Sequence, residues 1–512
     1  MSPIRVWAVP GVDNSRSSEL IPPGLPVFWK SGSPNHFRLL KGWLSLCDGG
    51  RCGYQGECRR NSNTLPTRLL DLGEGGIHTD TVYLRGTAEI STNPAETRYI
   101  ALSHCWGEKM KGMTPEWCTT YDNESTRKKE GFSIDEVLPK TFKDTIKVAR
   151  AIGVRYLWID SLCIMQGDGG DWNTEATKMT EVFKNAYCTI AAASAEDSDQ
   201  GFLDQRESDF PYAMVPNSSH GKVFVCRATD DFPGDVENGV LNTRAWVLQE
   251  RLLSARTIHF TKRQTYWECG GGVRCETLTN MRNGNHSFRY DPNFPGSIGD
   301  RSLTAQIKLV QDLFEQYTTL SLTYQNDRPT AIHSLAMELG KALDTNVAYG
   351  IFGKAPFLHR SLLWRGLGCS LKQILPELPS WSWMAYHVND EQSKDAAKIK
   401  YQDVEDVEWD KSVRLVEQQE AGNNRWILKA RVMRRRDTSE EDGDKEDLYF
   451  DLGQALDDVR YAVMGRKADA NPTYYVLVVQ GSPASGWKRV GMGLVPKRYI
   501  LFDDQDIVAK IW

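Results

Sequence analysis

The amino-acid sequence predicts an α/β fold: a parallel sheet flanked by helices over residues 99–255, followed by a mixed α+β region over residues 256–512. Two observations predict this fold. Between residues 99 and 255, short apolar segments typical of buried strands alternate with segments whose apolar residues recur at helical spacing. In addition, 40% of the residues are hydrophobic and 25% are charged, which is the balance of an ordinary globular protein. Residues 1–98 are expected to form an N-terminal leader with a small cysteine-containing segment.

The first elements of the α/β part are a strand, a helix and a second strand. Residues 99–104 have the apolar character of a strand. Thr141 is expected to cap a helix that ends at Gly153, because threonine is common at helix starts and glycine at helix ends. Residues 156–160 form a second buried strand, which ends in Asp160.

A second helix, a third strand and a closing helix complete the α/β part. Asp171 is expected to cap the second helix, and residues 187–193 and 244–253 form the third strand and the last helix. The second helix has an apolar stripe made of Trp172, Ala176, Met179, Phe183 and Ala186. Regular alternation of strands and helices implies a parallel sheet with right-handed crossovers.

The carboxyl ends of the three predicted strands mark the edge where a ligand is expected. Sheets of this kind bind ligands beyond the carboxyl ends of their strands. The segments that follow the strands are Ser103–Gly107, Asp160–Gln166 and Ser194–Asp199. Residues in these three segments that can bind or react are therefore the candidates for a functional site.

The flanking segments predict additional small elements. Residues 1–40 are rich in Pro, Gly and Ser and predict an irregular leader, followed by a short helix over residues 40–47. Residues 67–72 and 81–84 are typical of strands and predict a small ribbon ahead of the main sheet.

After the α/β part, the pattern changes to hairpins, helices and strands. Residues 257–260 and 264–268 predict a hairpin, and residues 302–344 predict helices. Residues 426–432 and 474–479 predict strands of the C-terminal region.

Several function classes are disfavoured by composition and motifs. The net charge is −5 and the one basic run, 431–436, is followed at once by acidic residues, so a nucleic-acid surface is not expected. No apolar run reaches the roughly 18 residues of a membrane span, and the N-terminus lacks the apolar core of a signal peptide. The glycines at 270–272 lack the spacing and the following Lys-Ser/Thr of an ATP-binding P-loop. Eleven cysteines spread over a long chain indicate reduced thiols, and we expect a cytoplasmic protein.

Three blocks of the sequence resemble the signature blocks of the fungal heterokaryon-incompatibility (HET) domain, in the family's order. They are Tyr-Ile-Ala-Leu-Ser-His-Cys-Trp-Gly at 99–107, Tyr-Leu-Trp-Ile-Asp-Ser-Leu-Cys-Ile-Met-Gln at 156–166, and Thr-Arg-Ala-Trp-Val-Leu-Gln-Glu-Arg-Leu-Leu-Ser at 243–254. The resemblance implies a role in heterokaryon incompatibility, the regulated death of fused fungal cells that differ at recognition loci. It also implies a protein partner or self-assembly through the HET domain.

HET domains in turn resemble TIR domains remotely, and some TIR domains cleave NAD at the nicotinamide–ribose bond. This second resemblance implies a TIR/flavodoxin-like parallel sheet, and NAD as a substrate rather than a cofactor. The TIR pattern Trp-Cys-x-x-Glu would fall on Trp246-Val-Leu-Gln-Glu250. Val247 replaces the cysteine, so this chain departs from the pattern at one position.

Glu250 is the candidate catalytic residue. Trp246 and Glu250 are four residues apart and therefore share one face of a helix, so that an indole lies beside a carboxylate. When nicotinamide leaves NAD, a positive, oxocarbenium-like centre develops on the ribose, and a nearby carboxylate can stabilise it. The alternative is that Glu250 forms a surface ion pair, for example with Arg251.

Asp160, Ser103 and Trp106 are, with Trp246, the candidate substrate-binding residues. Asp160 and Ser103 lie at strand ends, where a ligand is expected, although Asp160 could equally cap the loop that follows. Trp106 would shape the first loop or act as a core aromatic, and Gly107 would allow a positive φ there.

The cysteines suggest two further hypotheses. A nucleophilic pair of His104 with Cys105 is disfavoured because neighbours on a strand point to opposite faces, which leaves His104 with Cys163 as the alternative. The second hypothesis is a zinc site.

Cys47, Cys52 and Cys58 have spacings that would suit zinc if a fourth ligand came from a distant segment, and Cys269 with Cys275 is a second candidate pair. Relatives often carry a histidine between the first two cysteines, and this chain does not. Reduced structural cysteines without a metal are therefore the expectation.

Three functions remain in competition. The first is a HET-domain death effector that acts through NAD cleavage at Glu250. The second is a non-enzymatic interaction module, in which the HET unit assembles with a partner and residues 255–512 detect allelic differences. The third is a biosynthetic enzyme that reuses the fold.

Overall fold

The structure is a computed structural model in which two compact units can be distinguished, residues 1–294 and residues 295–512. The described residues are 4–10, 21–54, 58, 64–73, 79–90, 97–203, 206, 212–218, 221–281, 291–367, 371–388, 399–420, 423–436, 446–453, 456–468, 472–502 and 508–512.

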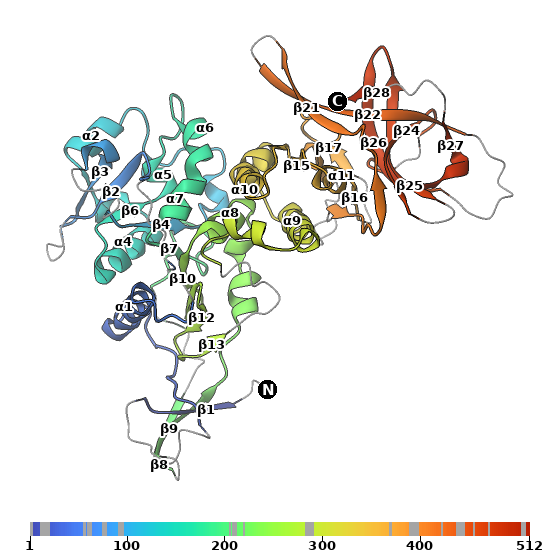
Figure 1. Ribbon diagram of the computed structural model, residues 1–512. Coiled ribbons are helices and arrows are strands. Elements are labelled where there is room, and N and C mark those ends of the chain that lie inside the picture. The colour runs from blue at the N-terminus through green and yellow to red at the C-terminus, as the bar shows by residue number, and fades with distance from the viewer. Residues whose placement is uncertain are drawn as a thin grey trace. The chain divides into compact units, whose positions relative to one another are not determined.

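A ten-stranded sheet forms the centre of the first unit (Figure 1). Its strands are β2 (Arg68–Asp71), β3 (Thr81–Gly86), β4 (Tyr99–Ser103), β5 (Phe132–Ser133), β6 (Tyr156–Trp158), β7 (Cys188–Ala191), β10 (Arg256–Phe260), β11 (Thr265–Cys269), β12 (Gly272–Cys275) and β13 (Asn280–Met281). Their order across the sheet is β13-β12-β11-β10-β7-β4-β6-β2-β3-β5. Four neighbours, β10, β7, β4 and β6, run parallel, and Ala101 of β4 lies opposite Trp158 and Thr189.

The strands predicted at 99–104, 156–160 and 187–193 run parallel, as expected, but they belong to a larger sheet that is mixed. On one side β2 pairs antiparallel with β6, and on the other β11 pairs antiparallel with β10. Both predicted hairpins exist, but β2 and β3 do not form a separate ribbon ahead of the main sheet. Each hairpin pairs with an edge of the parallel core, where unpaired backbone groups would otherwise remain.

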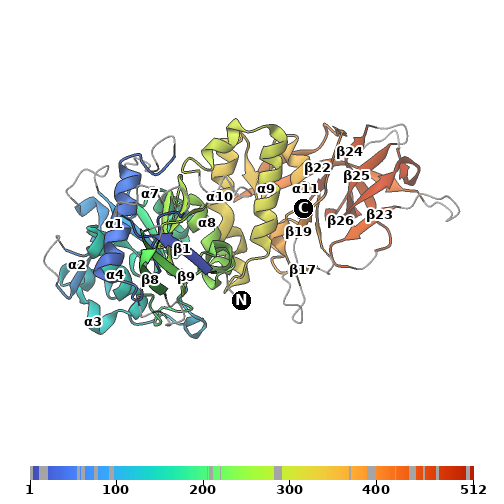
Figure 2. The same cartoon turned by 90° about the horizontal axis from the view of Figure 1, so that it is seen from below.

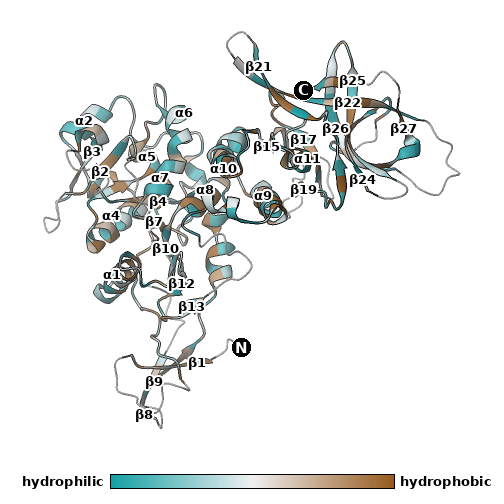
Figure 3. Cartoon of the chain, in the orientation of Figure 1, coloured by the Kyte–Doolittle hydropathy of each residue, from teal (hydrophilic) through white to brown (hydrophobic). Residues whose placement is uncertain are grey.

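Helices pack against this sheet. The longer ones are α1 (Pro34–Asp48), α4 (Lys140–Ile152), α7 (Met179–Asn185) and α8 (Ala245–Leu253), and the shorter ones are α2 (Glu124–Lys129), α3 (Ile134–Val137), α5 (Asp160–Cys163) and α6 (Trp172–Glu175). Helix α1 lies beside α4, as Figure 2 shows, and α7 lies beside α8. Figure 3 shows hydrophilic residues on α6 and α7. Phe142, Ile146 and Ala149 share one buried face of α4, as their helical spacing predicts.

The helix boundaries agree with the prediction at one end and differ at others. Gly153 ends α4 in the left-handed conformation, with φ 84°. Thr141 does not cap this helix, because Pro139 occupies the cap position and Thr141 lies buried within the first turn. Asp171 does occupy the cap of α6, but its side chain accepts a hydrogen bond from the Met165 amide instead of from the helix. The second predicted helix is interrupted by a 3-10 turn between α6 and α7.

The predicted irregular leader contains regular structure. Strand β1 (Ile4–Ala8) pairs with β9 (Gly221–Arg227), which pairs with β8 (Tyr212–Ser218) in a three-stranded sheet. Helix α1 begins at Pro34, earlier than expected, because Ser33 accepts a hydrogen bond from the backbone amide of His36 as an N-cap. Residues 11–20 of the leader lie outside the described part of the chain.

The second unit combines helices with a strand-rich region, as predicted for the C-terminal part. Its helices are α9 (Leu303–Thr318), α10 (Arg328–Ala342) and α11 (Phe357–Leu362). A sheet of nine strands contains β20 (Val407–Trp409), β21 (Arg414–Glu420), β22 (Asn423–Arg435), β23 (Asp447–Phe450), β24 (Arg460–Lys467), β25 (Thr473–Ser482), β26 (Gly486–Pro496), β27 (Ile500–Leu501) and β28 (Val508–Ile511). The predicted helices over 302–344 and strands over 426–432 and 474–479 are confirmed.

Short strand pairs complete this unit. They are β14 (Val347–Ala348) with β15 (Ile351–Phe352), β16 (Trp364–Gly366) with β19 (Ile399–Tyr401), and β17 (Leu371–Gln373) with β18 (Tyr386–Val388). The core of the nine-stranded sheet includes Tyr461, Val476 and Val495, whose side chains are fully buried.

Candidate functional site

The three segments that follow the central parallel strands meet at one edge of the sheet, as expected. The indole Nε1 of Trp106, after β4, donates a hydrogen bond to Asp160 Oδ2, after β6, at 2.8 Å. The hydroxyl of Ser198, after β7, donates to the backbone carbonyl of Trp106 at 3.4 Å. This edge is where parallel strands of α/β sheets present ligand-binding residues.

Ser103 and Glu250 form the central contact of the site. Ser103 is the last residue of β4, and its hydroxyl donates a hydrogen bond of 2.5 Å to Glu250 Oε2. Glu250 lies on α8, and both residues are buried, with 3% and 8% of their surfaces exposed. Residues that are 147 positions apart in the sequence are thus joined by one buried hydrogen bond.

The surroundings of Glu250 raise its pKa to about 7. Burial is the largest cause, because removal of water disfavours the charged carboxylate. The Ser103 hydrogen bond and the positive charge of Arg244 lower the pKa, and the negative charge of Asp160 raises it. A carboxyl with a pKa near neutrality can accept or donate a proton under physiological conditions.

Asp160 supplies a second carboxyl in a different environment. Its side chain is 21% exposed, and its Oδ1 accepts a hydrogen bond of 2.7 Å from the backbone amide of Ser161. Asp160 therefore binds a backbone amide at the start of α5, as one of its two predicted roles requires, and it also holds the Trp106 indole. Two carboxyls in unlike environments are a common arrangement for acid–base chemistry.

His104 lies behind Asp160 as a neutral, buried side chain. Its Nδ1 is 3.9 Å from Asp160 Oδ1, and its ring packs edge-on against Phe142 at 5.0 Å. Burial lowers the pKa of His104 to about 4, with Arg244 also lowering it and Asp160 opposing. No described residue offers a hydrogen bond to its Nε2.

Arg244 positions the segment that contains His104. Its guanidinium donates a hydrogen bond of 3.0 Å to the backbone carbonyl of His104, immediately before the first turn of α8. This contact links the end of β4 to the helix that carries Glu250. Sequence reasoning did not single out Arg244, although it lies inside the third signature block.

Gly107 allows the loop after β4 to pass close to the loop after β7. Its φ is +95°, as the sequence analysis expected for this position. A Cβ atom on Gly107 would lie 2.5 Å from the Cβ of Asp197, well inside van der Waals contact. The position therefore requires glycine for two independent reasons.

Trp246 is half-buried, and its described ring contact is with another tryptophan. It packs edge-on against Trp172 of α6, with 5.6 Å between ring centroids. The structure thus brings Ser103 to Glu250 and Trp106 to Asp160, whereas Trp246 contacts the neighbouring helix. The side chain of Trp106 also packs edge-on against Trp117 at 5.7 Å.

The structure disfavours two alternatives that the sequence left open, the ion pair of Glu250 with Arg251 and a cysteine nucleophile. Arg251 does not pair with Glu250 at the surface: its guanidinium binds the carboxylate of Glu268 at 2.9 Å, and Glu250 is buried. For the pair of His104 with Cys163, burial raises the pKa of the Cys163 thiol to about 12, which disfavours the thiolate that a nucleophile needs. The Cys163 thiol faces the carbonyl of Leu157 instead.

One cluster was incompletely predicted. Cys47, Cys52 and Cys58 gather around Cys269, which the sequence analysis had grouped with Cys275. The spacing identified three members, but the fourth comes from the end of β11, and only the tertiary pairing of that strand shows it. These four thiols are the described residues best suited to hold a metal.

A comparison with protein families finds a match that spans the site. The family model described as heterokaryon incompatibility protein (HET) matches residues 99–250, from the first residue of β4 to Glu250. Comparisons with curated proteins and with solved structures found no match. In the described part of the chain, no helix combines the length and apolar character needed to cross a membrane.

Proposed function

Residues 99–250 form a HET domain, and from this we propose that the chain acts in fungal heterokaryon incompatibility by cleaving NAD at the nicotinamide–ribose bond. Loss of NAD would then cause the death of the fused cell. The proposal assigns the catalytic role to Glu250 and substrate binding to Ser103, Trp106, Asp160 and Trp246.

The observation that carries the proposal is the buried Glu250–Ser103 pair at the carboxyl edge of the parallel strands. A carboxyl that titrates near pH 7 suits a reaction in which charge develops and a proton moves. Nearby Asp160 is more exposed and accepts hydrogen bonds from an indole and an amide. Paired carboxyls in unlike surroundings support glycoside-type chemistry, of which nicotinamide–ribose cleavage is one case.

The proposed reaction balances with water as the only co-substrate. The bond between ribose C1′ and the nicotinamide nitrogen breaks, and its electron pair neutralises the pyridinium ring. The ionised Glu250 stabilises the positive charge that develops on the ribose. Water then adds to C1′, and its proton passes to the Glu250 carboxylate and on to solvent, which leaves ADP-ribose and nicotinamide.

The order of the parallel strands supports the further proposal of a TIR/flavodoxin-like arrangement. In chain order, the four parallel strands are β4, β6, β7 and β10, and they lie in the spatial order β6-β4-β7-β10. The chain thus places β6 on one side of β4 and then crosses to place β7 on the other side. Such a change of direction creates a topological switch point next to β4. Ser103 lies at the carboxyl end of this strand.

The test is nicotinamide release from NAD by the purified full-length chain, measured at several protein concentrations. We expect Glu250→Gln to lose at least ~100-fold in rate, the usual contribution of a positioned acid or base. Glu130→Gln is the matched control, because Glu130 is an exposed carboxyl at the end of α2, outside the three segments that form the site. A rate that rises more steeply than protein concentration would indicate that assembly completes the site. Equal rates for wild type and Glu250→Gln would refute the assignment.

The low exposure of Glu250 favours one second candidate, a non-enzymatic interaction module. In that case the Ser103–Glu250 pair would hold α8 to the sheet, and death would follow from partner binding. Cell death that survives Glu250→Ala, with constant NAD, but is lost when residues 295–512 are deleted would support this candidate. A ligand other than NAD that co-purifies with the chain would instead support a biosynthetic enzyme.

A further inference from the structure

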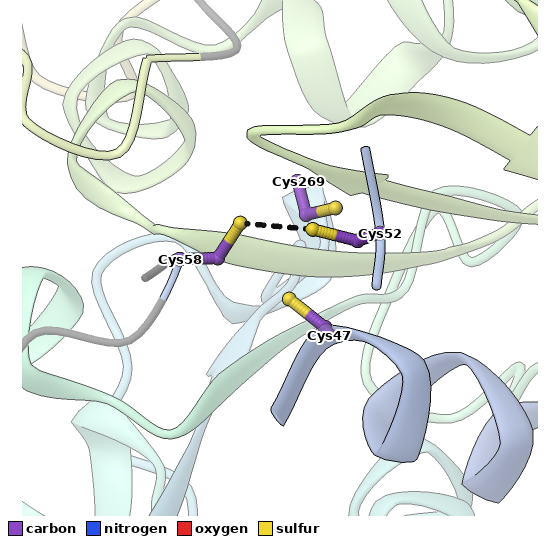
Figure 4. A group of neighbouring side chains, drawn as sticks. All are labelled: Cys47, Cys52, Cys58 and Cys269. Atoms are coloured by element: carbon purple, nitrogen blue, oxygen red, sulfur yellow. Dashed lines mark hydrogen bonds between the residues drawn. The ribbon is translucent and has the colours of Figure 1, made fainter. Parts of the chain in front are cut away.

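Four buried cysteines from three separate segments converge on one point in the first unit (Figure 4). Cys47 lies in the last turn of α1, Cys52 and Cys58 follow in the next segment, and Cys269 is the last residue of β11. Their exposed fractions are 3% or less. All four sulfur atoms lie within 4.8 Å of one another.

We propose that these four thiolates bind a structural Zn²⁺ ion. Zinc in a tetrahedral site of four cysteines lies about 2.3 Å from each sulfur, which places the sulfurs about 3.8 Å apart. The sulfurs of Cys52 and Cys58 are 3.4 Å apart, and no pair of sulfurs in the cluster is more than 4.8 Å apart. The sulfur–sulfur distance of a zinc site lies between these two values.

The backbone around the cluster is shaped to let the ligands approach. Gly271 donates its amide to the sulfur of Cys269 at 3.4 Å, a contact typical of metal-bound thiolates, whose second-shell donors orient the ligands. A Cβ on Gly270 would lie 3.0 Å from the sulfur of Cys58, and one on Gly271 would lie 2.1 Å from the carbonyl of Cys52. The turn between β11 and β12 thus accommodates the cluster only because it is built from glycine.

Positive charge near the cluster offsets its excess of negative charge. Four thiolates and one Zn²⁺ carry a net charge of −2, which is costly to bury without cations nearby. Arg256 of β10 lies opposite Cys269 in the pairing of β10 with β11, and Arg274 donates a hydrogen bond to the carbonyl of Cys52 at 2.9 Å. Two guanidinium groups therefore support an anionic metal site.

Two metal-free alternatives fit the geometry less well. A disulfide requires a sulfur–sulfur distance of about 2.05 Å, and Cys52 and Cys58 are 3.4 Å apart. Four reduced thiols can satisfy one another only in part, through weak S–H hydrogen bonds. Buried cysteines elsewhere in the described chain, such as Cys188 and Cys118, do not form such a group.

The role of the ion would be structural. All four coordination positions come from protein thiolates, so none remains open for a substrate or a reactive water. The ligands join the end of α1 and the segment after it to a strand more than two hundred residues further along the chain. A metal at this point fixes the N-terminal segment to the sheet that carries the HET domain.

Metal analysis of the full-length chain tests the proposal. Protein purified without chelators should contain about one Zn²⁺ per chain. Cys269→Ser and Cys52→Ser should each lower the zinc content at least about fivefold, because each removes one of four ligands. Cys275→Ser is the matched control, since Cys275 is equally buried on β12 but its sulfur contacts Thr277 rather than the cluster.

Cobalt substitution keeps the test decisive if the serine variants fail to fold. Wild-type protein loaded with Co²⁺ should show the intense visible absorption of a tetrahedral tetrathiolate complex, with sulfur-to-metal charge-transfer bands in the near ultraviolet. A chain that takes up neither metal, or one in which mass spectrometry finds a Cys52–Cys58 disulfide, would overturn the proposal. So would loss of zinc from Cys275→Ser equal to that from Cys269→Ser.

Discussion

Burial of Glu250 against Ser103 gives an ordinary carboxyl a pKa of about 7. Removal of water favours the protonated form, and the neighbouring Asp160 adds repulsion, whereas the Ser103 hydroxyl and Arg244 favour the ionised form. The balance leaves Glu250 divided between both forms at neutral pH.

The pKa of Glu250 predicts how the stability of the first unit depends on pH. The folded value of about 7 exceeds the ordinary 4.5, so the folded state binds more protons between these two values. The contribution of Glu250 to the free energy of unfolding is therefore fully present below pH 4.5. It is lost as the pH rises from 4.5 to about 7, and the free energy does not change further above pH 7. The loss at pH 8 is on the order of 3 kcal/mol.

Glu250→Gln should therefore be more stable than wild type at pH 8 and nearly equal to it at pH 5. Thermal unfolding at the two pH values measures the difference, with Glu130→Gln as the exposed control. A stability difference that does not change between pH 5 and pH 8 would mean that Glu250 titrates at its ordinary value.

Substitutions of the two neighbours should move the pKa of Glu250 in opposite directions. Ser103→Ala removes a hydrogen bond that favours the carboxylate, so the pKa should rise. Asp160→Asn removes a nearby negative charge, so the pKa should fall. The midpoint of nicotinamide release against pH should follow both changes, upward for Ser103→Ala and downward for Asp160→Asn. Displacement of both midpoints in one direction would contradict this electrostatic account.

At the scale of elements, the local sequence patterns predicted where strands and helices lie better than they predicted which strands pair with one another. Residues 67–84 were predicted as a hairpin, which exists, but the pairing of Leu70 with Leu157 makes it part of the main sheet. Periodicity reports which face of a strand is buried and not which strand lies beside it. The predicted cap at Thr141 is wrong, because Pro139, with its fixed φ, occupies the cap position of α4.

The loop after β4 depends on Gly107, and a pair of glycine variants can test this. Gly107→Ala combines a positive φ of 95° with a contact of 2.5 Å to Asp197. Gly112→Ala has a similar φ of 77° but meets nothing within 4 Å, so it isolates the backbone strain. Gly107→Ala should cost about 1–3 kcal/mol more than Gly112→Ala in urea unfolding. Equal costs would show that the approach to Asp197 is not constrained.

At the scale of the molecule, the HET match covers only part of the folded unit. The match spans residues 99–250, whereas the sheet also contains strands from residues 68–86 and 256–281. Ion pairs join these parts, among them Arg68 with Asp171 and Lys262 with Glu196. The parallel core alone would leave both of its edges unpaired.

A fragment of residues 1–294 should therefore fold, and a fragment of residues 99–255 should not. Circular dichroism during heating should show a cooperative transition for the longer fragment and a gradual change for the shorter one. Cooperative unfolding of residues 99–255 would show that the flanking hairpins are dispensable.

The sequence predicted much of the site and less of its physical environment. Ser103, Asp160 and Glu250 were selected from strand ends and a signature block, and they meet at one edge. Their hydrogen bonds, the contribution of Arg244 and the addition of Cys269 to the other three cysteines depend on tertiary contacts between distant segments. Spacing along the sequence does not show which strands pair, and these contacts depend on that pairing.

The most direct test of the account is the pH dependence of nicotinamide release from NAD by the purified full-length chain and by Glu250→Gln. The account requires ionised Glu250, so the rate should rise about tenfold per pH unit below pH 7 and become constant above it. Glu250→Gln should release at least ~100-fold less nicotinamide at every pH. No release by wild type at any pH, or the same profile from Glu250→Gln, would contradict the account.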